Sequence, residues 1–217
     1  MLSAMSVWLP MGVALLLLVI AMHLLFKGGM LAAVMRAVMG MAFLAASALS
    51  FLTAYDLMSY RPLFEEQAVV TLQFQKLAAK RFRVVLVDSE SRQYDYYLDG
   101  DQWQLDARLL RWRPALAKVG FEPLYRLERL SGRYADLHQQ LREPQTAHQL
   151  GVPPTNFDSW ALIKQLPWLR DWVDAQYGSA TFLPMADGAV YEVKLAYGGM
   201  LARPVNDQAR AAVNGWQ

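Results

Sequence analysis

The sequence predicts an N-terminal transmembrane helical hairpin followed by an α+β soluble domain that is mainly antiparallel β. Charged side chains are almost absent from residues 1–60, which contain only Lys27, Arg36 and Asp56, although the 217-residue chain has 21 Lys and Arg and 19 Asp and Glu. Further along, apolar residues alternate over short runs, as in half-buried strands. We therefore divide the chain into a membrane part, residues 1–60, and a soluble part, residues 61–217.

Two apolar runs form the predicted hairpin, at about residues 7–26 and 30–54. The first has twenty residues without a formal charge, the length that crosses a hydrocarbon core of about 30 Å. The second run is interrupted only by Arg36. Both runs must be helical, because lipid satisfies no free backbone N–H or C=O group. The turn between them is formed by Lys27, Gly28 and Gly29.

The basic residues of the hairpin predict its orientation, because Lys and Arg in short loops stay in the cytoplasm. Lys27 lies in the turn and Arg36 follows soon after it. The turn is therefore expected on the cytoplasmic side of a bacterial inner membrane. The N-terminus and residues 61–217 would lie outside, in the periplasm of a Gram-negative cell. The aromatic belt at the outer interface would contain Trp8, Tyr55 and Tyr60.

A stripe of small residues runs along the second predicted span at intervals of four, at Ala42, Ala46, Ser50 and Ala54. Small residues let helix backbones approach closely in lipid. Two interpretations remain open. The stripe packs against the first span within the hairpin, or it docks another integral membrane protein or a second copy of the chain.

The soluble part begins with four predicted strands, at residues 68–75, 80–88, 92–98 and 102–112. Asp-Gly is a favoured hairpin turn, so Asp99-Gly100-Asp101 suggests that these strands form one antiparallel meander. Residues 136–154 are expected to form a loop with one helical turn. The remaining predicted elements are strands at residues 124–134, 180–184, 189–197 and 200–203, and a short helix at residues 206–213.

A helical segment rich in tryptophan is predicted at about residues 158–177, capped by Asp158 or Ser159 and split by Pro167. After the split, Trp168, Leu169, Trp172 and Val173 share one face. We expect this face to cover the sheet and to bury at least one of the two tryptophans. The alternative is an interaction face that touches the membrane surface or a protein partner.

No residue pattern predicts catalysis, a cofactor or a metal. The chain has no cysteine and no phosphate-binding or nucleophile motif. His138 and His148 lie in a predicted loop without carboxylates at ligand spacing. Acidic residues near the predicted hairpin turn are typical of solvated turns; they are Asp95, Asp99, Asp101 and Asp106. The net charge of +2 is too small to predict nucleic-acid binding. Because no catalytic motif is present, we expect a protein that is not an enzyme.

Three stretches resemble a family of small proteobacterial inner-membrane proteins commonly labelled cation/multidrug efflux pump or multidrug transporter. They are residues 100–112 (GDQWQLDARLLRW), 124–134 (LYRLERLSGRY) and 177–195 (YGSATFLPMADGAVYEVKL). The resemblance covers the hairpin and most of the soluble part, and it implies a role in an envelope complex.

A proton-driven pump needs ionisable residues within the membrane, whereas neither predicted span contains a carboxylate. The leading hypothesis is therefore a non-enzymatic accessory or scaffolding subunit of a larger envelope complex, which docks through the hairpin and a periplasmic interaction domain. The alternative is a transport or efflux component that acts with a larger pump or as a homo-oligomer.

Overall fold

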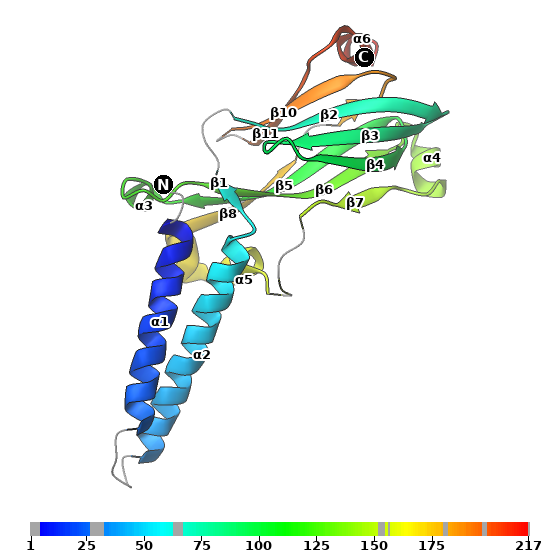
Figure 1. Cartoon of the computed structure of the whole chain (residues 1–217). Helices are drawn as coiled ribbons and strands as arrows, with labels where there is room; N and C mark the ends of the chain where they lie inside the picture. Colours follow the sequence, from blue (N-terminus) through cyan, green and yellow to red (C-terminus); the bar gives the residue numbers. More distant parts are fainter. Residues whose placement is uncertain are drawn as a thin grey trace. The chain divides into compact units, whose positions relative to one another are not determined.

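The computed structural model describes residues 5–26, 33–62, 67–151, 155, 157–179, 182–196 and 199–216 (Figure 1). The chain packs into two compact units. The first comprises residues 1–62, 110–124 and 153–175, and the second comprises residues 63–109, 125–152 and 176–217. We call residues 110–124 and 153–175 the collar. The collar belongs to the predicted soluble part of the sequence, yet it packs with the two N-terminal helices.

Two long helices begin the first unit and pack against each other, α1 (Met5–Phe26) and α2 (Ala33–Leu57). Within α2, Val34–Leu57 is long and apolar enough to cross a membrane. The apolar described part of α1, Val7–His23, is shorter. The N-terminal helices expected from the two apolar runs are therefore present. The predicted turn at Lys27, Gly28 and Gly29 lies outside the described residues.

A five-stranded sheet, with strand order β11-β10-β2-β3-β4, lies in the second unit. Its strands are β2 (Gln67–Ala78), β3 (Arg81–Asp88), β4 (Gln93–Asp99), β10 (Val190–Ala196) and β11 (Gly199–Pro204). The neighbouring strands pair antiparallel. Alternate residues of β3 are buried, which is the period of two that predicted this strand from its sequence.

A second sheet has the order β1-β6-β5-β8, with β7 paired to β6 and β9 paired to β5. Its strands are β1 (Arg61–Pro62), β5 (Gln102–Trp112), β6 (Leu124–Arg133), β7 (Ala147–Gln149), β8 (Val173–Ser179) and β9 (Leu183–Pro184). Residues from both sheets form one apolar core in the second unit, around Phe74, Trp103 and Tyr191. The soluble part is thus an antiparallel sheet domain, as the alternating runs predict.

The predicted four-stranded meander is wrong at its last strand, because β5 belongs to the second sheet rather than pairing with β4. The turn at Gly100 is a corner between sheets. Gly100 has φ +131°, and a Cβ there would collide with the backbone of Arg133. The backbone N–H of Asp101 donates to the carbonyl oxygen of Arg133 on β6, over 2.8 Å. After β4 the chain therefore continues as β5, which pairs with β6 in the second sheet. Glycine at position 100 makes the close approach to the Arg133 backbone possible.

The predicted helix over residues 158–177 is also wrong in its second half. Helix α5 (Ser159–Gln165) is followed by a 3-10 helix, η1 (Pro167–Asp171), and the chain then becomes strand β8. Asp158 caps α5 and Pro167 begins η1, as expected. The short remaining helices are α3 (Pro114–Ala117), α4 (Leu137–Arg142) and α6 (Asp207–Asn214). The predicted loop at residues 136–154 contains α4 and β7.

Candidate functional site

Small residues form the interface between α1 and α2. Ala14 and Ala21 are buried on α1, and Gly40, Ser47 and Ala54 are buried on α2. The spacing of seven residues keeps each set on one seam of its helix. The hydroxyl of Ser47 donates to the carbonyl oxygen of Ala14 over 2.7 Å. The two backbones therefore approach closely and share a polar contact, as in membrane helix pairs.

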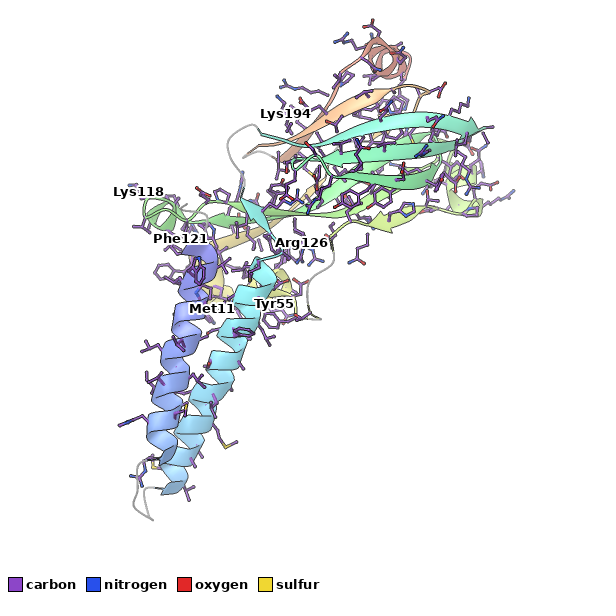
Figure 2. All side chains as sticks on the ribbon, viewed as in Figure 1. Met11, Tyr55, Lys118, Phe121, Arg126 and Lys194 are labelled. Carbon is purple, nitrogen blue, oxygen red and sulfur yellow. The ribbon has the colours of Figure 1, made fainter. Side chains whose placement is uncertain are left out.

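Large apolar side chains of this helix pair point outward instead of inward. This arrangement is the reverse of a water-soluble helical bundle, and lipid is the solvent that tolerates it. The outward residues include Trp8, Leu15, Leu16 and Val19 on α1, and Val34, Met35, Val38 and Met41 on α2. Figure 2 shows Met11 of α1 and Tyr55 of α2 near the end of the pair where α1 begins and α2 ends.

The predicted stripe of small residues does not form a single face. Ala54 is fully buried against the neighbouring helix, Ser50 and Ala46 are half-buried, and Ala42 is exposed. Residues four apart advance by about 40° around an α-helix, so the stripe winds from the α1 seam to the outer surface. Ala54 thus belongs to packing within the pair, whereas Ala42 is available to another helix.

Asp56, near the end of α2, connects this helix to the collar by a hydrogen bond that the sequence does not predict. Its side chain is fully buried, and one carboxylate oxygen accepts the backbone N–H of Ser159 over 2.9 Å. Asp158 caps the same helix start by accepting the N–H groups of Trp160 and Ala161. The first three N–H groups of α5 are thus satisfied by two carboxylates, one of them from α2. A carboxylate in the last turn of an apolar helix was the available sequence signal.

An apolar cluster closes the junction between the end of α2 and the collar. Tyr60, which the sequence places in the aromatic belt, is buried in this cluster. Trp8 and Tyr55, in contrast, are 66% and 40% exposed. The buried members of the cluster are Leu57, Tyr60, Leu110, Leu124, Ile163 and Val173, and Val7, Trp112, Trp160, Leu169 and Ala175 pack around them.

The predicted interaction face is divided by the structure. Val173 is buried and Leu169 is half-buried in the junction cluster. Trp168 and Trp172 are 62% and 54% exposed, so the expected burial of at least one of them is wrong. Their spacing of four suggested a common helical face, but Trp172 follows the end of η1, and the chain then enters β8. The two tryptophans form an exposed pair on the collar.

The collar's other tryptophans, Trp112 and Trp160, contact residues of the first unit. The indole Nε1 of Trp112 donates to the carbonyl oxygen of Glu122 over 2.8 Å, and its ring packs on Phe121 with centroids 5.1 Å apart. The ammonium of Lys164 lies 3.9 Å from the ring centroid of Trp160. Phe121 and Lys118 are both labelled on this part of the collar in Figure 2. Trp112 and Trp160 therefore stabilise the collar, whereas Trp168 and Trp172 are free to contact something outside it.

The acidic residues near Gly100 make structural ion pairs in the second unit. Asp95 lies 2.9 Å from the Arg83 guanidinium and raises its pKa by a hydrogen bond and by charge. Asp101 lies 3.1 Å from the Lys80 ammonium, and the buried Asp106 lies 2.7 Å from Arg129. Asp99 lies 3.6 Å from Arg81. These pairs satisfy the carboxylates within the fold.

The two histidines of the soluble part do not meet. A ring nitrogen of His148 lies 2.7 Å from the carbonyl oxygen of Tyr97, and the His148 ring packs on Tyr96. His138 lies on α4. Among the described residues, no three His, Asp or Glu side chains are placed to hold a metal ion.

The second unit has an open groove of about 720 Å³ beside α6. Its lining includes Lys76, Lys80, Phe82, Asp101, Met185 and Trp216. Lys80 also donates to the side-chain oxygen of Gln139. The Lys80 ammonium of this groove is therefore already paired within the protein, with Asp101 and Gln139.

No family model, curated protein or solved structure matches the chain. The resemblance to the two-span inner-membrane family therefore stays a prediction.

Proposed function

We propose that this chain is a non-enzymatic accessory or scaffolding subunit of a larger envelope complex in a bacterial inner membrane. In this proposal α1 and α2 cross the bilayer, Lys27 and Arg36 keep their turn in the cytoplasm, and the sheets lie in the periplasm. The observation that carries the proposal is the arrangement of side chains on the helix pair. Small residues form the seam between the helices, and large apolar residues cover the outside.

The collar supports a scaffolding role. The end of α2 is bound to the start of α5 through Asp56 and Ser159, and an apolar cluster closes the junction. The collar in turn continues along the chain into strands β5, β6 and β8. The anchor helices and the collar thus form one compact unit, which suits a subunit that organises neighbouring proteins at the membrane.

The outward surface of α2 around Ala42 is the proposed docking face for another integral membrane protein or a second copy. Ala42 and Ala45 are exposed and Ala46 is half-buried. Small exposed residues let a partner helix approach closely, where dispersion and backbone contacts then stabilise the pair. We expect one membrane partner to be retained in stoichiometric amount when the full chain is extracted in mild detergent.

The same substitution at two positions of α2 tests the docking face. Ala42→Leu adds bulk on the outer surface, so the partner should be lost while the amount of the protein in the membrane stays normal. Ala54→Leu adds the same bulk in the α1 seam, so it should lower the amount of the protein itself. Co-purification and membrane abundance are measured for both variants. A wild-type chain that is extracted as a monomer without a partner contradicts the proposal, and so does an Ala42→Leu variant that retains its partner in full.

A further inference from the structure

The exposed pair Trp168 and Trp172 lies at the end of the hairpin where α1 begins and α2 ends. The first residue of helix α5, Ser159, donates its backbone N–H to Asp56 of α2, and η1 packs against α5. Between the two tryptophans in sequence, Leu169 packs into the cluster that contains Leu57 of α2 and Val7 of α1. Figure 1 shows α5 beside the last turns of α2. These contacts fix the pair near the junction of helices and collar.

The length of α2 sets the depth of this junction in a bilayer. Val34–Leu57 has 24 residues, and a helix of that length spans about 36 Å. The hydrocarbon core is about 30 Å thick, so the last turn of a spanning α2 reaches the headgroups. The same end of the helix pair carries the exposed side chains of Trp8 and Tyr55. Tryptophan and tyrosine are the residues that favour this interfacial layer.

We propose that Trp168 and Trp172 insert into the headgroup layer of the bilayer that the hairpin spans, and so hold the collar on the membrane surface. The inference rests on the membrane anchoring of the proposed function. Lipid is the favoured occupant because the exposed pair belongs to the same compact unit as the outward apolar side chains of the hairpin.

The polar groups around the pair suit a headgroup environment. Arg170 lies between the two tryptophans and is exposed, and its guanidinium donates to the carbonyl oxygen of Lys164. The Lys164 side chain is also exposed and lies over the Trp160 ring. Asp171 is exposed beside them, so the surface carries both signs of charge. A mixed polar surface with an aromatic pair matches zwitterionic and anionic headgroups, in which Arg and Lys meet phosphate and the indole rings meet the upper acyl chains.

The test uses the full-length chain in nanodiscs whose lipids are brominated near the headgroup end of the acyl chain. Bromine quenches only those tryptophans that it contacts. We expect Trp168→Phe/Trp172→Phe to lose a large part of the quenching seen in the wild type. Lipids brominated near the chain terminus should quench the pair much less. Trp216→Phe is the matched control, because it replaces an exposed tryptophan outside the collar, on the second unit.

Trp8→Phe separates failure of this inference from failure of the anchoring. If Trp8 accounts for quenching and the Trp168/Trp172 pair does not, the hairpin is inserted but the pair lies away from lipid, and the inference is overturned. If neither Trp8 nor the pair is quenched, the membrane anchoring itself is wrong. A pair that is shielded from lipid by a second copy would give unquenched fluorescence with a dimer in the nanodisc, and this result would also overturn the inference.

Discussion

The carboxylate of Asp56 and the backbone N–H of Ser159 meet although they are 103 positions apart in the sequence. Both groups are fully buried. A buried donor that loses its acceptor costs about 1–3 kcal/mol, so this hydrogen bond contributes directly to the attachment of the collar.

Asp56→Ala should therefore loosen the start of α5. Asn keeps a side-chain oxygen that accepts the same N–H, so Asp56→Asn should retain most of the attachment. Hydrogen exchange of the full-length chain in nanodiscs measures the effect. We expect faster exchange at Ser159 in the alanine variant than in the asparagine variant. Equal exchange in the wild type and Asp56→Ala would show that Asp56 does not hold the helix start.

Tyr191 links the two sheets of the second unit and provides a pH-dependent contribution to stability. Burial raises its pKa to about 12, from an ordinary value of about 10. Its hydroxyl donates to the carbonyl oxygen of Pro184 over 2.8 Å. Because the folded state favours the neutral phenol, this contribution is fully present below about pH 10 and is lost as the pH rises through about 12.

Tyr191→Phe should lower the free energy of unfolding by about 1 kcal/mol near neutral pH, since one hydrogen bond is removed. It should also make the free energy of unfolding fall less steeply than in the wild type between about pH 10 and pH 12. Denaturant unfolding of both proteins over this range measures the two effects. Parallel curves for the two proteins would mean that Tyr191 titrates no differently in the folded and unfolded chains.

The elements of the collar show what a sequence pattern can and cannot predict. Asp158 and Pro167 act locally, so the start of α5 and its separation from η1 were predictable. Strand β8 was not predictable from the sequence. Its pairing with the distant strand β5 overrides the helical spacing of Trp168 and Trp172. The contact of Asp56 with Ser159 and the switch of β5 to the second sheet also depend on partners far along the chain. An alternating pattern identifies the buried face of a strand but not its neighbour.

The exposed and buried members of the predicted interaction face should respond differently to truncation. Trp168→Ala and Trp172→Ala remove exposed side chains, so each should change the free energy of unfolding by only about 0.5 kcal/mol in detergent. Leu124→Ala removes a buried side chain of the junction cluster and should cost about 2–5 kcal/mol. Thermal unfolding of the three full-length variants compares them. A tryptophan variant as unstable as Leu124→Ala would mean that its ring is part of the core.

The path of the chain through the two compact units is discontinuous in sequence. Five changes between the two compact units occur along the sequence, at residues 62, 109, 124, 152 and 175. The collar therefore cannot be removed with the hairpin as one continuous N-terminal segment. Each of the two units is therefore built from three separate segments of the chain.

Membrane topology is the most direct test of this architecture, and the absence of native cysteine makes it clean. Single cysteines are introduced at Gly29→Cys in the predicted turn, which keeps Lys27, and at Asp187→Cys on the second unit. Intact spheroplasts are then treated with a membrane-impermeant maleimide. We predict immediate labelling at position 187, and labelling at position 29 only after the membrane is permeabilised. Labelling at both positions in intact spheroplasts, or at position 29 alone, would contradict a two-helix anchor that carries its sheets on the periplasmic side.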